Sequence, residues 1–408
     1  MTEAAPPISL LVVADSDSYL KWAVSRLLEA PSSWRTELLV VRNAVTPSAE
    51  QITAAVDGRL EHEPAVVSFD ALEARLRAER PDVLLLACRG PLIQLLVEER
   101  FGGVPPCKVA VAGIPGIWLP PTELGVTLRA SVDMLVVHSV RERAAVATML
   151  PRGRIREVGL ASLVDDRAVG GGERPRVIFA PQALVPHDVD HRRALLAGLV
   201  AAAHANPQLD WIIKLRGTEG EAQTHAEHAS FPALARDIPA AGWPANLRFA
   251  HGPLRDYLGD CAGFVTVSST AALEAIAAGV PVICLDDFGV DAGAINVVFE
   301  GSRLFGSLTD LARLGFRDPD PAWCHDNYFH PADESDWIAR AEAMARDGGT
   351  ATLAGYRAPR GGMRGAARRA RRRHEALGSA DTPLRHLVAS TAAGAVRALH
   401  RAREGRGA

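Results

Sequence analysis

The most restrictive feature of this sequence is a repeated alternation of short apolar stretches with amphipathic helical stretches. In the first 165 residues the apolar stretches are residues 8–14, 37–41, 65–69, 83–87, 108–112 and 134–137, and helical patterns cover 19–29, 49–56 and 71–80. Nearly continuous apolar strands separated by helices indicate a parallel sheet that is covered on both faces. The first part of the chain is therefore predicted to be a doubly wound α/β domain.

The alternation stops at a polar, glycine-rich segment, residues 169–175, and then starts again. The second set of predicted strands is 176–180, 211–215, 247–250, 264–267 and 280–285, with a long helix at 187–205. The predicted organisation is an N-terminal Rossmann-like domain (1–165), a linker (166–175), a second Rossmann-like domain (176–348) and Ala- and Arg-rich C-terminal helices (349–408). Two such domains leave a cleft between them, and ligands of these sheets bind at the carboxyl ends of the strands.

Charge and apolar content narrow the class of protein. The formal net charge is -3, whereas a general nucleic-acid binder is usually basic, so we expect no nucleic-acid partner. No apolar run approaches the ~18–20 residues that cross a bilayer, and no basic stretch precedes residues 8–14 as it would in a signal peptide. The five cysteines form no CxxC pair, which favours buried thiols in a reducing compartment. We expect a cytoplasmic protein.

One turn in the second domain has the character of an anion site. An apolar strand runs directly into Ser268, Ser269 and Thr270, and a short helix follows that ends at Gly279. Free backbone N–H groups at a helix start attract anions, and hydroxyl residues there add donors. Glu274 lies one turn further on, where its carboxylate could accept ribose hydroxyls. The alternative is an ordinary N-capped helix of an α/β sheet.

The run from Ser268 to Ile283 resembles the donor segment of GT-B glycosyltransferases. The branch it is most similar to holds CDP-glycerol glycerophosphotransferases, bacterial polysialyltransferases and capsular Kdo transferases, and an actinobacterial glycosyltransferase-like family is closest. UDP-GlcNAc 2-epimerases have a similar segment. The resemblance implies a GT-B-like fold and a donor diphosphate on Ser268, Ser269 and Thr270, with ribose on Glu274. It also implies that Asp286 lies near the donor sugar, and that the protein needs neither a metal nor another cofactor.

Two further segments fit this resemblance. Residues 179–183 end the first strand of the second domain, where related transferases carry a Pro-containing turn, and this places Gln182 at the donor. Residues 211–217 resemble a strand that carries Lys-x-His-Pro in that branch. Here Arg216 and Gly217 stand in place of His-Pro. Arginine is a permanent cation with a fork of donors, so we expect Arg216 to take over the contact with donor phosphate.

Polar residues that follow strands of the first domain are candidates for acceptor chemistry. A general base near the acceptor hydroxyl is needed for inverting transfer, and Asp15 and Glu123 are the two candidates. Asp17 could contact the acceptor or cap a helix. Arg89 could hold an acceptor phosphate or carboxylate. Trp118 could stack on a sugar or lipid, or belong to a rigid packing loop.

Three other features suggest a function less specifically. His138 ends a strand, and a structural role is the more common one for a single histidine. His187 and His191 are four apart, but no HExxH motif or cysteine partner accompanies them, so no metal is expected. The arginines between Arg357 and Arg373 either form a solvated helix face or make a patch that contacts an anionic acceptor or anionic lipid at the inner face of the membrane.

The sequence thus predicts a glycosyltransferase with a CMP-, CDP- or UDP-linked sugar donor and a cell-envelope glycan or lipid-linked acceptor. Two alternatives remain open. One is a UDP-sugar 2-epimerase or hydrolase on the same scaffold, and the other is a non-catalytic protein that binds nucleotide sugars.

Overall fold

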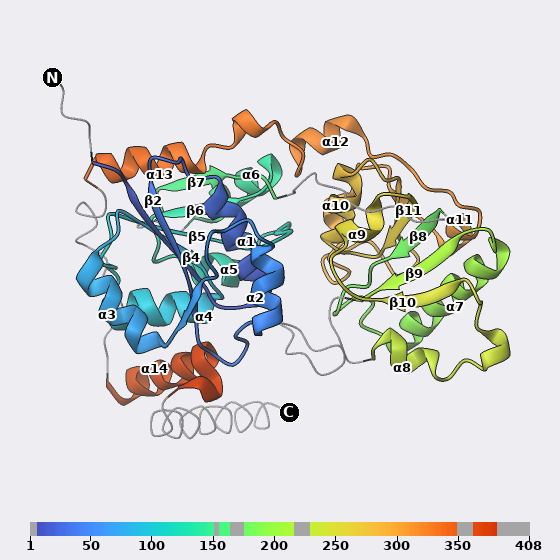
Figure 1. The fold of residues 1–408 in the computed structure, drawn as a ribbon, viewed down its shortest axis with the longest axis horizontal. Coiled ribbons are helices and arrows are strands. Elements are labelled where there is room, and N and C mark those ends of the chain that lie inside the picture. Colours follow the sequence, from blue (N-terminus) through green and yellow to red (C-terminus); the bar gives the residue numbers. More distant parts are fainter. Residues whose placement is uncertain (1–5, 151–154, 164–174, 216–228, 349–361, 382–408) are drawn as a thin grey trace, which may run out of the picture.

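The computed structural model describes residues 6–150, 155–163, 175–215, 229–348 and 362–381, and the side chains of the last helix from residue 369. Two α/β domains lie next to each other, each built on a parallel sheet (Figure 1). This confirms the predicted fold class of two doubly wound Rossmann-like domains.

The first sheet has seven parallel strands in the order β3-β2-β1-β4-β5-β6-β7. They are β1 (Ser9–Ala14), β2 (Arg35–Val41), β3 (Ala65–Val67), β4 (Val83–Ala87), β5 (Val109–Gly113), β6 (Met134–Val137) and β7 (Glu157–Leu160). The strand order reverses between β1 and β4, because β2 and β3 extend to one side and the later strands to the other. Such a switch point opens a crevice at the carboxyl ends of the two strands.

Helices cover both faces of this sheet. Successive β1 side chains alternate between two cores: Leu10 and Val12 belong to one, and Leu11 and Val13 to the other. The first core is completed by α1 (Asp17–Leu28), α2 (Ala49–Val56) and α13 (Trp337–Arg346). The second is completed by α3 (Phe69–Glu79), α4 (Gly90–Ile93) with its π-helical continuation η1 (Gln94–Arg100), α5 (Glu123–Thr127), α6 (Val140–Met149) and α14 (Gly362–Leu377).

The second sheet has six parallel strands in the order β10-β9-β8-β11-β12-β13. They are β8 (Arg176–Phe179), β9 (Asp210–Lys214), β10 (Leu247–Ala250), β11 (Cys261–Thr266), β12 (Val282–Leu285) and β13 (Phe305–Gly306). Its described helices are α7 (Val189–Ala205), α8 (Phe231–Ala235), α9 (Arg255–Leu258), α10 (Ala271–Ala277), α11 (Leu308–Ala312) and α12 (Pro321–Asp326). The switch point here lies between β8 and β11.

Helix α13 returns to the first domain, although the sequence-based division placed residues 176–348 in the second. Trp337 is buried in the core beneath β1, and its backbone lies so close to Gly159 of β7 that a Cβ there would come within 2.9 Å of the Trp337 Cα. The side chain of Asp336 accepts a hydrogen bond from the Leu160 N–H at 2.8 Å. Contacts between α13 and strands that are distant in sequence therefore determine this domain boundary, and no local sequence pattern indicates it.

Most strands lie where the sequence predicts them, and two edge strands were missed. β7 contains a glutamate and a glycine, and β13 has only two residues, so neither shows a continuous apolar run. The predicted linker, residues 166–175, lies outside the described residues except for its last residue.

Candidate active site

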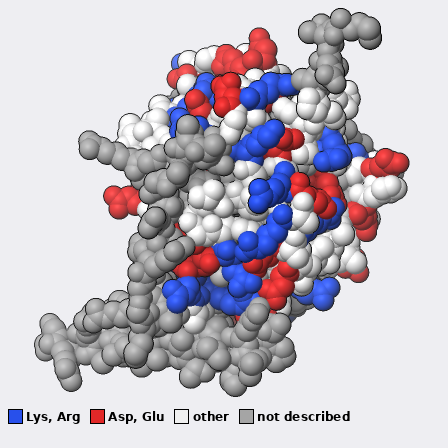
Figure 2. Space-filling view, turned by 90° about the vertical axis from the view of Figure 1, so that its left-hand side faces the viewer, with Lys and Arg blue, Asp and Glu red and all other residues white. Residues whose placement is uncertain are grey.

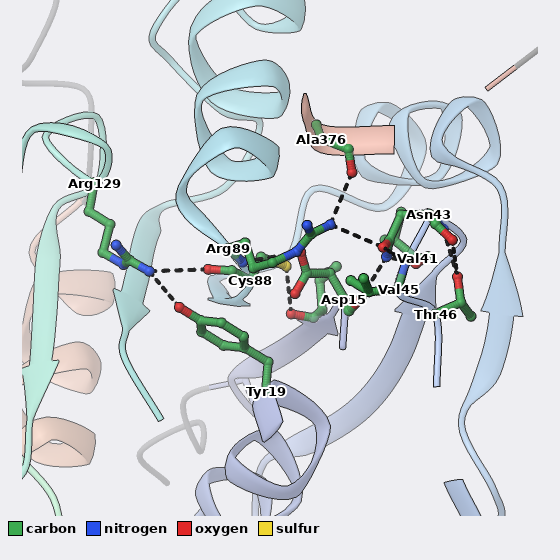
Figure 3. Close-up of polar contacts among 11 residues, drawn as sticks. Asp15, Tyr19, Val41, Asn43, Val45, Thr46, Cys88, Arg89, Arg129 and Ala376 are labelled. Carbon is green, nitrogen blue, oxygen red and sulfur yellow. Dashed lines mark hydrogen bonds and ion pairs between the residues drawn. The ribbon is translucent and has the colours of Figure 1, made fainter. Parts of the chain in front are cut away.

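Asp15 and Arg89 meet at the switch point of the first sheet (Figure 3). Asp15 follows β1 and Arg89 follows β4, and these strands pair in parallel, so their carboxyl ends lie together. The Arg89 Nε lies 2.9 Å from the Asp15 Oδ2, and the Arg89 backbone N–H donates to the same oxygen at 3.1 Å. Two residues 74 positions apart thus form an ion pair where a ligand of this sheet is expected.

The guanidinium of Arg89 is held from two further sides. Its Nη2 donates to the Asn43 Oδ1 at 3.0 Å and to the Ala376 carbonyl at 3.2 Å. Asn43 follows β2 and in turn donates to the Asp15 carbonyl at 2.6 Å. Ala376 belongs to the last turn of α14, where the free carbonyls carry partial negative charge. The C-terminal helix therefore completes the surroundings of this pair, and 23% of the Arg89 side chain stays exposed.

Asp15 is fully buried, and one of its oxygens has no hydrogen-bond partner among the described residues. This is Oδ1, since Oδ2 receives both bonds from Arg89. Burial raises the pKa of the Asp15 carboxyl, and the Arg89 charge opposes that shift. An unsatisfied buried acceptor costs free energy unless a ligand supplies a hydrogen-bond donor. Unsatisfied polar atoms of this kind are a known feature of active sites.

A second guanidinium, Arg129, lies beside this pair and ties together the strand ends (Figure 3). It is buried and donates to the Gly113 carbonyl at 3.2 Å, to the Gly125 carbonyl at 3.1 Å and to the Tyr19 hydroxyl at 2.6 Å. A longer contact of 3.4 Å reaches the Cys88 carbonyl. Because β4, β5, α1 and α5 all contribute, Arg129 fixes the rim of the crevice.

The hydroxyl turn of the second domain lies where its sequence predicts, between β11 and α10. The Ser268 hydroxyl donates to the carbonyl of Ile295, a residue with a left-handed backbone (φ 56°). The Ser269 Oγ accepts from the Ala271 N–H at 3.2 Å. Thr270 is the N-cap residue of α10, and its side chain makes no capping hydrogen bond. Of the three, Thr270 has the hydroxyl most available to a ligand.

The other donor-side candidates are spread around this turn. Glu274 and Asp286 are exposed, Glu274 on α10 and Asp286 directly after β12. The Gln182 Oε1 accepts from the Leu184 and Val185 N–H groups, so this oxygen shapes its own loop. Arg216 lies outside the described residues.

A loop of the first domain reaches the hydroxyl turn. A Cβ at Gly116 (φ 107°) would lie 3.0 Å from the Thr270 Cγ2. Trp118 on the same loop is 7% exposed and packs in the core of the first domain, as the packing alternative predicts. Glu123 is exposed at the start of α5. The loop that follows β5 in the first domain therefore contacts the turn between β11 and α10 in the second.

Asp17 does not cap α1, contrary to the capping alternative. Ser16 is the N-cap residue, and Asp17 forms an ion pair with Lys21 at 2.8 Å.

Sequence reasoning missed Asn43, Arg129 and Glu142. Asn43 could have been found as a polar residue after a strand. Arg129 and the fully buried Glu142 lie in or beside helices, where nothing in the local sequence indicates their distant partners.

Arginines of α14 form ion pairs within this chain. Arg372 lies 2.8 Å from Glu98 and 2.9 Å from Glu99, and Arg373 binds Asp381 through two bonds. Basic and acidic side chains also alternate over the side of the first domain that Figure 2 shows. Arg357 and Arg360 lie outside the described residues. Contact of this segment with anionic lipid stays a prediction.

The described residues contain neither a metal-ligand cluster nor a membrane-spanning helix. No group of three or more His, Cys, Asp or Glu side chains there is placed to hold a metal ion, and no helix there is long and apolar enough to span a bilayer.

The two facing Rossmann-like domains define a GT-B-type α/β protein. A family model described as "Putative glycosyltransferase (DUF6716)" matches residues 10–344, and this chain belongs to that family. None of the curated proteins matches the chain in sequence.

Solved structures with the same fold include UDP-N-acetylglucosamine 2-epimerases. The S. aureus MnaA–UDP structure has a TM-score of 0.53 and 11% identity, covering 87% of this chain and 100% of that one. The Methanocaldococcus jannaschii UDP-GlcNAc 2-epimerase with UDP-GlcNAc and UDP has a TM-score of 0.52 and 11% identity, covering 82% and 99%. A Listeria monocytogenes structure described as a UDP-N-acetylglucosamine 2-epimerase has a TM-score of 0.51 and 13% identity, covering 83% and 94%. At such identities these likenesses show the fold alone.

Proposed function

We propose that this protein transfers a sugar from a nucleotide-activated donor to a cell-envelope glycan or lipid-linked acceptor. The observation that carries the proposal is the approach of Gly116 to Thr270, which brings the loop after β5 of the first domain to the hydroxyl turn of the second. Membership of a glycosyltransferase family supports the reaction class. The nucleotide would be CMP, CDP or UDP, bound in the second domain.

In this proposal the leaving diphosphate lies on Ser268, Ser269 and Thr270, with Arg216 as a cation beside it. Hydrogen-bond donors that are already in place before the reaction stabilise the charge that develops on the leaving group, because they do not have to reorganise. Glu274 would hold the ribose, Asp286 the sugar and Gln182 the loop beside them. No step here needs a metal.

Asp15 would be the general base, and Glu123 is the second candidate. A raised pKa brings a carboxylate closer to the operating pH, which favours proton transfer. Once the sugar acceptor enters the crevice, the unpartnered Oδ1 of Asp15 would accept a hydrogen bond, and then the proton, from its attacking hydroxyl. Arg89 would orient that carboxylate and contact an anionic group of the acceptor, with Asp17 and Trp118 in the surrounding wall.

Thr270→Val tests the donor site, since it removes one hydroxyl and keeps the methyl group beside Gly116. Loss of a hydrogen bond to a charged group costs about 1.5–3 kcal/mol, so we expect roughly 10- to 100-fold weaker nucleotide binding. The measurement is calorimetric titration with CMP, CDP, UDP and GDP. Thr148→Val, on the exposed face of α6, is the control. A wild-type protein that binds none of the four nucleotides would refute the proposal.

A 2-epimerase or hydrolase is the second candidate, favoured by the fold shared with UDP-GlcNAc 2-epimerases. These reactions need no acceptor. Incubation with each nucleotide sugar alone, followed by NMR of the products, separates the candidates: an epimerised or hydrolysed sugar supports the second, and an unchanged donor that reacts only with added acceptor supports transfer.

A further inference from the structure

Glu142 is a buried carboxylate that joins three separate parts of the chain. Its Oε1 accepts from the Trp118 N–H at 2.6 Å and from the Tyr328 hydroxyl at 2.6 Å, and its Oε2 accepts from the His138 N–H at 2.9 Å. The side chain is fully buried, and burial raises its pKa. A carboxylate in such a place costs free energy, so its three donors must all stay in position.

Local sequence gives Glu142 a different role from the one observed. Ser139-Val-Arg-Glu142 has the spacing of a capping box, in which the glutamate would turn back to the N–H of Ser139. The Ser139 hydroxyl does cap α6, accepting from the Glu142 N–H at 3.0 Å. The carboxylate instead bonds outside the helix, which points to a tertiary role.

The three donors come from both domains. Tyr328 follows α12 and packs in the core of the second domain with Trp323 and Phe299, while Trp118 and His138 belong to the first. Beside it, the Nη1 of Arg141 lies 3.4 Å from the Asn327 Oδ1. The Tyr328 hydroxyl stays protonated as a donor, since burial and the Glu142 charge raise its pKa well above 10.

Trp118 lies on the loop that reaches the hydroxyl turn. Ile117 and Leu119, on either side of it, pack against the core of the second domain that contains α10. The backbone of Gly116 lies against the Thr270 side chain, so close that a Cβ at this position would have little room. The hydrogen bond from the Trp118 N–H to Glu142 therefore helps to fix the position of this loop relative to the hydroxyl turn.

We propose that Glu142 is a positioning residue for the donor, holding the loop 114–122 of the first domain against the hydroxyl turn of the second through Trp118 and Tyr328. This rests on the proposed function, because it assumes that the nucleotide binds at that turn. Glu142 touches no ligand itself and acts by keeping both walls of the site in register.

Tyr328→Phe is the central test, since it removes one hydrogen bond to Glu142 and leaves the ring in place. Its matched control is Tyr257→Phe, which removes a hydroxyl bonded within the second domain to the His251 carbonyl. Nucleotide affinity is measured by calorimetry well below the melting temperature of each variant. We expect roughly tenfold weaker binding for Tyr328→Phe, the effect of losing one charge-assisted hydrogen bond, and no change for Tyr257→Phe.

Gly116→Ala is a second variant that moves the same loop without touching Glu142. If both variants act through the loop, their combined effect on affinity is smaller than the product of the single effects. A purely structural role would lower the melting temperature of Tyr328→Phe and leave the affinity of the folded protein unchanged.

The outcomes are distinct. If wild type binds a nucleotide and Tyr328→Phe binds it equally well, the inference is wrong and the proposed function stands. If wild type binds none of CMP, CDP, UDP and GDP, the proposed function and the inference built on it both fall.

Discussion

At the scale of single residues, burial decides which polar side chains carry charge. His138 follows β6 and is 1% exposed. Its Nε2 accepts from the Trp22 indole N–H at 2.7 Å, so its Nδ1 carries the proton and donates to the Ala161 carbonyl at 2.9 Å. Burial is the main cause that lowers its pKa from 6.5 to about 3. The ring is neutral and structural, as its sequence position suggested.

This lowered pKa predicts a loss of stability in acid. Between pH 6.5 and pH 3 His138 binds a proton in the unfolded chain but not in the folded chain. The free energy of unfolding therefore falls as pH decreases from 6.5 towards 3. The slope is about 1.4 kcal/mol per pH unit, or about 2 kcal/mol at pH 5. Urea unfolding of wild type and His138→Gln at pH 7.5 and pH 5 measures it.

The stability advantage of wild type over His138→Gln should shrink by that amount at pH 5. The carboxyls of Asp15, Glu29 and Glu142 have raised pKa values and shift stability the opposite way, but they do so in both proteins and cancel. An advantage that is equal at the two pH values would contradict the assignment.

At the scale of elements, α14 is part of the first domain. Ala376 and Leu377 are buried in its core, and the Arg373 guanidinium lies 5.5 Å from the centre of the Phe69 ring. The family model matches residues 10–344, so α14 lies outside the matched residues, and its Ala376 carbonyl accepts a hydrogen bond from Arg89.

We expect Arg372→Ala to destabilise the protein by about 1–3 kcal/mol, because it leaves the nearly buried Glu98 without this cation. Arg369→Ala, an exposed arginine of the same helix, should stay within about 0.5 kcal/mol of wild type. Denaturant unfolding monitored by circular dichroism measures both. Equal losses in the two variants would show that α14 does not depend on the ion pair.

At the scale of the whole molecule, the domains are joined at separate places. α13 carries the chain back to the first sheet, and Glu142 meets Tyr328 near the hydroxyl turn. A third link is the ion pair of Asp57, after α2, with Arg255 of α9, at 2.7 Å. Both partners are about one-third exposed, so solvent and salt screen this link.

Because an exposed ion pair contributes about 1 kcal/mol or less, Arg255→Ala should leave the melting temperature nearly unchanged. We expect it to widen the spread of domain separations in low salt, measured by small-angle X-ray scattering. Arg193→Ala removes an exposed pair within α7 and is the control. A scattering profile identical to wild type in low salt would mean that the pair does not restrain the domains.

The sequence by itself determined the fold class and the place of the hydroxyl turn. Buried parallel strands need apolar side chains on both faces, and this requirement is written locally in stretches such as β4 and β12. The turn at Ser268–Thr270 was visible because a strand end and a helix start adjoin in the chain.

Only the tertiary structure decided the partners of the polar residues. Arg89 meets Asp15 and Ala376 through contacts that span 74 and 287 positions, and Glu142 meets Tyr328 across 186. The return of α13 to the first domain could not be predicted for the same reason. Periodicity reports which face of an element is buried, whereas the partner on that face depends on how the two domains pack.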